Sequence, residues 1–115
     1  MSIDLPEMLL LPEAYPAGVE AVELVETLLS WVFLTGSHAY KVKKPVHYDF
    51  VDFSTLSQRR YFCLEELRCN RAFSPELYID VVPVLHLPDG SLKLGSCDQM
   101  NDERVADYAV KMVQF

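Results

Sequence analysis

The stretch that decides the fold is residues 30–46, which read SWVFLTGSHAYKVKKPV. β-Branched and aromatic residues lie on both sides of Thr35-Gly36-Ser37, and this pattern around a short glycine-containing turn is typical of a β-hairpin. We therefore predict strands near residues 31–35 and 38–43. Pro45 should end the second strand, because proline has no amide proton to donate to a neighbouring strand.

The segments around this hairpin predict the remaining elements. A strand is expected from about Val22, although the same residues also fit a helix. Ser54 can cap a helix that runs without glycine or proline until Ser74-Pro75. Three more strands are expected at 77–87, 91–94 and 106–113. Three strands, one helix and three strands indicate an α+β fold, an antiparallel sheet with one long helix packed on one face.

Composition limits the class of protein. The chain has 115 residues, half of them hydrophobic and 23% charged, as expected of one globular domain. Its net charge of −7 argues against a nucleic-acid or membrane-surface binder. Three cysteines without a CxxC pattern and three histidines without metal-like spacing indicate reduced thiols and no metal site. We expect a cytoplasmic protein without a membrane span.

The charge is unevenly distributed. Residues 41–71 contain seven basic and four acidic residues, whereas the rest of the chain contains three basic and thirteen acidic ones. A basic middle in an acidic protein suggests a local anion-binding site. Solvated lysines and arginines on a helix face would give the same count.

The second hairpin strand carries the first candidate residues. Because side chains alternate along a strand, Ala39, Lys41 and Lys43 share one face. A planar base could lie against the small Ala39 while Lys41 reaches its phosphates. The alternative is that Lys41 only protects a sheet edge from aggregation.

The helix carries the second candidates. A projection at 100° per residue places Glu65 within the expected packing face and Glu66 at its margin. The other members of that face are Tyr61, Phe62, Cys69, Ala72 and Phe73, while the four arginines 59, 60, 68 and 71 lie mostly on the solvent side. A carboxylate on a packing face needs a partner, and a lysine on the covered strand would serve. The alternative is pairing with helix arginines at helical spacing.

Four segments of the chain, which include the hairpin strand and the helix, resemble the sequences of a known protein family. Residues 22–46, FVDFSTLSQRRYFCLEELRCNR (50–71), SPELYIDVVPV (74–84) and YAVKMVQF (108–115) look like the N-terminal part of bacterial aminoglycoside phosphotransferase-like proteins. Many members of that family resemble kinases and carry a further P-loop ATPase domain. The resemblance covers about residues 20–115. It implies a protein-kinase-like N-terminal small lobe with about five antiparallel strands and one long helix.

Three prolines and a glycine in residues 1–18 predict an irregular lead-in with a short helical turn. The resemblance implies that residues 19–115 are a lobe truncated at the hinge, with the C-lobe absent, and it also implies roles for single residues. Lys41 would bind the α- and β-phosphates of ATP and pair with Glu65 or Glu66, a choice that stays open. Ala39, Met112 and Gln114 would line the adenine site, where residues 112–115 contribute backbone groups. Met112 also fits a plain core position.

The implied function is that of an ATP-binding small lobe of a small-molecule phosphotransferase, inactive by itself. ATP and magnesium would act only with a C-lobe, which would also bind the small-molecule acceptor. One departure is that Thr27-Leu28-Leu29-Ser30 replaces a glycine-rich phosphate loop. The alternative is a kinase-like interaction or regulatory module without catalysis, forming a homodimer through the exposed floor of the lobe.

Overall fold

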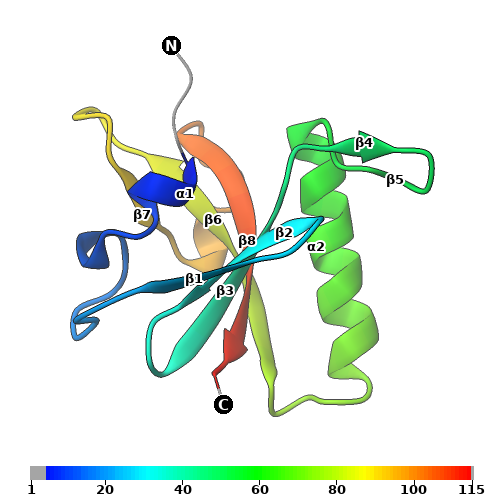
Figure 1. Cartoon of the computed structure of the whole chain (residues 1–115), viewed down its shortest axis with the longest axis horizontal. Helices are drawn as coiled ribbons and strands as arrows, with labels where there is room; N and C mark the ends of the chain where they lie inside the picture. Colours follow the sequence, from blue (N-terminus) through cyan, green and yellow to red (C-terminus); the bar gives the residue numbers. More distant parts are fainter. Residues whose placement is uncertain (1–4, 115) are drawn as a thin grey trace.

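The computed structural model describes residues 5–114 and places one long helix, α2 (Leu56–Arg71), beside an antiparallel sheet (Figure 1). The six strands of that sheet are β1 (Glu23–Glu26), β2 (Ser30–Leu34), β3 (His38–Lys43), β6 (Tyr78–His86), β7 (Leu92–Leu94) and β8 (Val105–Val113). The shorter elements are α1 (Leu5–Met8), the 3-10 helices η1 (Pro12–Ala14) and η2 (Cys97–Gln99), and a separate hairpin of β4 (His47–Tyr48) and β5 (Val51–Asp52).

The hairpin predicted from residues 30–46 is confirmed. Strands β2 and β3 pair antiparallel, with Leu34 opposite Ala39, and Gly36 adopts a φ of 102° in the turn between them. That angle belongs to the left-handed region, which glycine occupies at no steric cost. The other predicted strands and the helix also form, within one or two residues of their expected ends. The β4–β5 hairpin after Pro45 was not predicted.

The strand order of the sheet is β1-β2-β3-β8-β6-β7, so the last strand lies in the middle between β3 and β6. This insertion places Ala39 opposite Met112 and Lys41 opposite Val110. Residues 73 and 69 positions apart in the sequence thus become neighbours.

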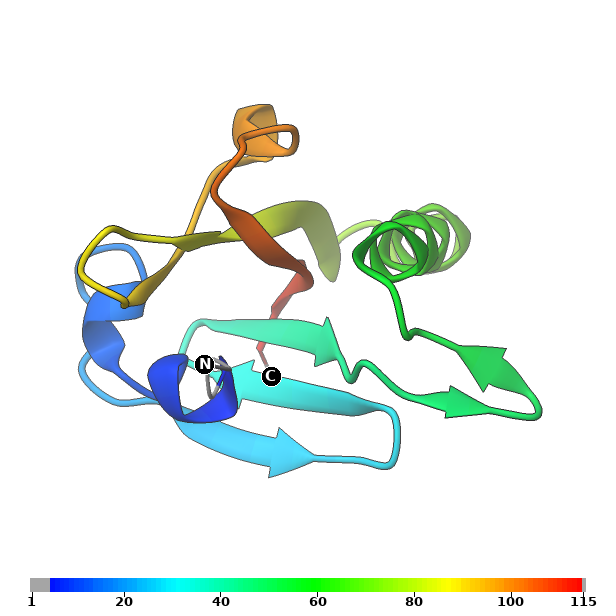
Figure 2. The ribbon, with the colours of Figure 1, turned by 90° about the horizontal axis from the view of Figure 1, so that it is seen from above.

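The prediction of a kinase-type small lobe with about five strands is wrong. The sheet has six strands and curls into a half-barrel, so that β1–β3 lie across from β6 and β7 (Figure 2). The sixth strand is the short β7, which pairs with β6. Its Leu92 and Leu94 are buried in the core, and this burial of apolar surface favours its place in the sheet.

The N-terminal segment fills the concave face of the curled sheet. Leu9, Ala14 and Tyr15 are buried there, and the Tyr15 hydroxyl donates to the carbonyl of Leu9 at 2.6 Å. The sheet residues of this cluster are Phe33, Tyr40, Val42, Val82, Val84, Leu92, Leu94 and Ala109. The segment expected as an irregular lead-in therefore supplies part of the main hydrophobic core; its residues 1–4 lie outside the described part of the chain.

Helix α2 covers the opposite face of β6 and β8. Cys63 and Leu67 pack with Val81, Tyr108 and Val110 in a second cluster. Because side chains alternate along a strand, Val81 belongs to this cluster whereas its neighbour Val82 belongs to the concave one. Strands β6 and β8 are thus covered on both faces.

The predicted packing face of α2 is wrong. The buried residues of the helix are Arg59, Cys63 and Leu67, whereas Tyr61 and Phe73 are 57% and 88% exposed. Exposed Cys69 and Ala72 likewise lie off the packing face. The helix is rotated relative to the predicted orientation, because Asp107 and Lys43 on the sheet form ion pairs with Arg59 and Glu66. The hydrophobic projection does not take such pairs into account. The N-cap is Thr55 rather than Ser54, since Thr55 and Gln58 form a capping box.

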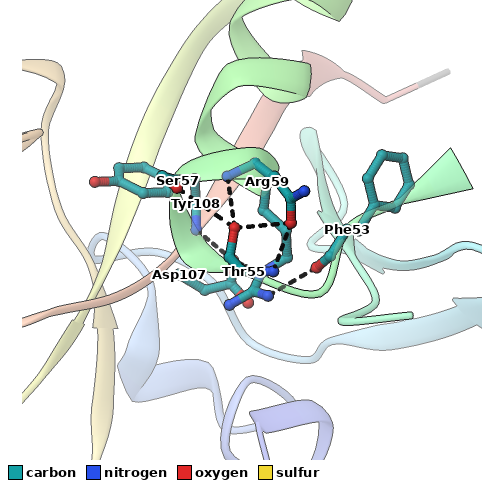
Figure 3. A network of polar contacts seen from close by, with 7 residues as sticks. Phe53, Thr55, Ser57, Arg59, Asp107 and Tyr108 are labelled. Carbon is teal, nitrogen blue, oxygen red and sulfur yellow. Dashed lines mark hydrogen bonds and ion pairs between the residues drawn. The ribbon is translucent and has the colours of Figure 1, made fainter. Parts of the chain in front are cut away.

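Arg59 anchors the start of α2 to the sheet (Figure 3). Its Nε donates to the carboxylate of Asp107 at 3.1 Å, and its Nη1 donates to the carbonyl of Phe53 at 2.9 Å. The same Asp107 oxygen accepts from the amide of Tyr108 at 2.8 Å. These hydrogen bonds join the start of α2 to β8 and to the segment that precedes the helix.

No helix among residues 5–114 has the length and hydrophobicity that crossing a membrane would require.

Candidate functional site

The candidate site is a group of three charged side chains between β3 and α2. Lys43 Nζ donates to Glu66 Oε1 at 2.7 Å, and Lys41 Nζ lies 3.4 Å from Glu66 Oε2. Lys41 and Lys43 point to the same side of β3 because they are two residues apart on a strand. Glu66 reaches them from the third turn of α2, next to the buried Cys63 and Leu67. We call Lys41, Lys43 and Glu66 the charged triad.

The structure separates the two glutamates that the sequence left as alternatives. Glu65 lies on the outer side of α2 and pairs with Arg68 at 2.6 Å, three residues along the helix. This is the helical-spacing pair that the sequence analysis gave as an alternative. Glu66 is the carboxylate that faces Lys41, because the helix turns 100° from one residue to the next.

A groove of about 660 Å³ opens beside the charged triad. Its walls come from the β1–β2 loop, from β2 and β3, from α2 and from the ends of β6 and β8. The lining residues are Thr27, Leu28, Leu29, Ser30, Val32, Lys41, Lys43, Phe53, Glu66, Tyr78 and Met112. All three members of the triad therefore border one open space.

A smaller apolar pocket of about 280 Å³ adjoins the groove, since Tyr78 and Met112 line both. Ala39 and Met112 face it from paired positions on β3 and β8. The remaining lining residues are Leu34, Leu77, Val113 and Gln114. The predicted set of Ala39, Lys41, Glu66, Met112 and Gln114 is thus brought to two adjoining cavities, and Glu65 is not.

Gln114 lies in the apolar pocket but its amide oxygen already has a partner. Its Oε1 accepts from the backbone amide of Gly36 at 2.9 Å, and its own backbone amide donates to the carbonyl of Ser37 at 3.1 Å. Gln114 therefore ties the end of β8 to the β2–β3 turn. Phe115, the last residue of the segment expected to contact a base, lies outside the described residues.

The loop from Thr27 to Ser30 borders the groove without a glycine. It is closed by the Thr27 amide donating to the Ser30 carbonyl at 2.9 Å and by the Ser30 amide donating to Thr27 Oγ1 at 3.0 Å. Leu28 at its tip is 62% exposed. The loop thus places an apolar side chain, and a hydroxyl, at the rim of the groove.

Sequence reasoning overlooked Lys43 as a site residue. The signal was present, because strand alternation already placed Lys43 on the same face as Lys41. What the sequence did not show is that Lys43, rather than Lys41, makes the shorter contact with the glutamate.

Other reactive side chains give no comparable arrangement. Among residues 5–114, His, Cys, Asp and Glu side chains form no group of three that could hold a metal ion. Burial raises the pKa of Cys63 to about 12, so its thiol stays protonated at neutral pH. The charged triad and its two cavities are therefore the candidate functional site.

Comparisons with known proteins find three mycobacterial relatives. Two proteins of Mycobacterium tuberculosis strains and one of Mycobacterium bovis, each named only as an uncharacterized protein, are 36% identical to this chain over 80 residues. The match covers 69% of this chain and only 16% of each relative, so the chain corresponds to a small part of their length. No family model matches the chain. No solved structure matches it either.

Proposed function

We propose that this chain is the nucleotide-binding part of an ATP-dependent small-molecule phosphotransferase. The observation that carries the proposal is the contact of Lys41 with Glu66 at the wall of a groove beside an apolar pocket that shares Tyr78 and Met112 with it. Lys41 would neutralise phosphate charge in the groove. A purine could lie in the pocket between Ala39 and Met112, which are both small enough or flexible enough to pack against a planar ring.

The chemistry of group transfer would need more than this site. Positioning and metal ions carry most of phosphoryl transfer, and the magnesium ions and the small-molecule acceptor would bind through residues outside this chain. The size of the relatives is consistent with such an arrangement, because 84% of each lies outside the match. The resemblance to aminoglycoside phosphotransferase-like proteins supports a small-molecule acceptor. The proposed function requires ATP, and this requirement supports a cytoplasmic location.

ATP binding by the 115-residue chain tests this proposal. Isothermal titration calorimetry should show binding that weakens about tenfold or more in Lys41→Met, since one charge-assisted hydrogen bond to phosphate is lost. Lys93→Met is the matched control, because Lys93 is exposed on the edge strand β7 and borders neither cavity. Absence of ATP binding by the unaltered chain would refute the function, and unchanged affinity in Lys41→Met would refute the role of Lys41.

An interaction or regulatory module is the second candidate. Exposed aromatic side chains favour it: Tyr48 and Phe50 stack at 5.6 Å on the β4–β5 hairpin, and Phe73 is almost fully exposed. A chain that binds no ATP but sediments as a dimer in analytical ultracentrifugation would support this candidate over the first.

A further inference from the structure

The charged triad contains one carboxylate and two lysines, and the two lysines are not equivalent. Lys43 makes the shorter contact with Glu66, 2.7 Å against 3.4 Å for Lys41. The side chain of Lys43 is 7% exposed, that of Glu66 14% and that of Lys41 32%. Lys43 therefore lies at the enclosed side of the groove wall, whereas Lys41 is the more accessible of the two lysines.

The surroundings of Lys43 fix it in place. Its Nζ lies 5.1 Å from the centre of the Phe53 ring, which is itself buried, so the ammonium group sits between a carboxylate and an aromatic face. An ammonium group removed from water is costly unless it is paired. Lys43 consequently needs Glu66 whether or not a ligand is present.

The pairing has a consequence for Lys41. With all three groups ionised, the triad carries one net positive charge. If Glu66 had only Lys41 beside it, the two would neutralise each other, and an anion would compete with the carboxylate for that lysine. Because Lys43 already satisfies Glu66, Lys41 can leave it at a smaller cost.

We propose that Lys43 is a positioning residue that holds Glu66 by a standing hydrogen bond and so leaves Lys41 free to bind a phosphate group in the groove. This inference rests on the proposed nucleotide function and adds a division of labour between the two lysines. Lys43 affects binding through Glu66 and does not touch the ligand. Its effect should therefore depend on the charge of the ligand.

Binding of ADP and of adenosine separates this role from a merely structural one. In Lys43→Met, calorimetry should show ADP affinity reduced roughly tenfold, the worth of one charge-assisted hydrogen bond, with adenosine affinity unchanged within twofold. Adding Glu66→Gln to that variant should restore most of the ADP affinity, because the carboxylate that captures Lys41 is then gone. Glu65→Gln in the same background is the matched control and should restore nothing, since Glu65 lies outside the groove.

Two results would overturn the proposal. Equal losses for ADP and adenosine in Lys43→Met would show that the substitution damages the whole site. Failure of the added Glu66→Gln to recover ADP binding, in a double variant whose circular dichroism matches the parent, would show that Glu66 does not capture Lys41.

A measurement without nucleotide keeps the two proposals apart. In nitrogen-15 NMR of the lysine side chains, the Lys43 ammonium protons should exchange slowly with water and give a signal, while those of Lys41 exchange too fast to be seen. Lys43→Met should make the Lys41 signal visible. If the unaltered chain binds no ADP, the nucleotide function fails, and this NMR pattern still decides between the lysines; a protected Lys41 beside a fast-exchanging Lys43 overturns the division of labour.

Discussion

Two ion-paired groups join α2 to the sheet, and they differ in what surrounds them. Arg59 and Asp107 form a closed pair with side chains 11% and 5% exposed, and each also bonds to backbone, of Phe53 and of Tyr108 respectively. The charged triad of Lys41, Lys43 and Glu66 borders an open groove and has one positive charge in excess.

The difference shows how burial alone misleads a search for functional residues. Arg59 and Asp107 bond to each other and to nearby backbone and border neither cavity, so this buried pair fixes the helix on the sheet. The charged triad has two lysines for one carboxylate, and its Lys41 is accessible from the groove, so it can bind an anionic ligand. The surplus and the opening, rather than the burial, make the charged triad the candidate site.

The largest effect is expected from breaking the closed pair. Arg59→Met would leave the Asp107 carboxylate buried without its partner, and removal of one member of a buried pair typically costs about 3–5 kcal/mol. Urea unfolding at pH 7 would measure the loss. Arg68→Met is the control, because Arg68 lies on the same helix but in a solvent-exposed pair with Glu65. A loss no larger than that of the control would mean that the closed pair does not anchor the helix.

A smaller loss of stability is expected from the open group. Glu66→Gln would leave Lys43 without a carboxylate, but water in the groove can reach the site, so we expect a loss of about 1–3 kcal/mol in the free energy of unfolding. Glu65→Gln one residue earlier should change stability little. Parallel urea curves for the two variants would check the comparison, and equal losses would remove the distinction that the structure draws between these neighbours.

The smallest effect is a pH dependence specific to the closed pair. Burial raises the pKa of the Asp107 carboxyl, an effect that Arg59 and the Tyr108 amide partly offset. Without Arg59 the pKa should rise further. A carboxyl group whose pKa is raised in the folded state stabilises the fold when the pH is below its ordinary pKa near 4. This stabilisation is lost as the pH rises through the raised pKa.

The loss of unfolding free energy caused by Arg59→Met should therefore shrink as the pH falls from 7 toward 4. The loss caused by Arg68→Met should stay constant. Urea unfolding at several pH values measures both. A deficit that grows on acidification would show that Asp107 is not the group left unpaired.

Much of the local structure follows from sequence patterns. The hairpin at residues 30–46 was predicted because a glycine-containing turn between β-branched and aromatic residues is typical of a β-hairpin. The shared face of Ala39, Lys41 and Lys43 was also predicted correctly, because alternation is a property of any strand. These are statements about neighbours in sequence, which local geometry governs.

The errors concern contacts between distant residues. The hydrophobic projection of α2 placed Tyr61 and Phe73 inside and Arg59 outside, and the structure reverses both. The projection assumes that apolar residues face the sheet, but Asp107 and Lys43 on the sheet provide partners that make a buried Arg59 and Glu66 acceptable. Those partners are 48 and 23 residues away along the chain.

By itself, the sequence determined α2, the six strands of the main sheet, their order along the chain and the face on which Lys41 lies, since these depend on dihedral preferences and on the period of side chains along a strand. The tertiary structure decided the rest. Insertion of β8 beside β3 brought Met112 to Ala39, and the rotation of α2 selected Glu66 over Glu65. Both outcomes depend on how the helix and the strands pack, because burial and charge pairing involve residues that are far apart along the chain.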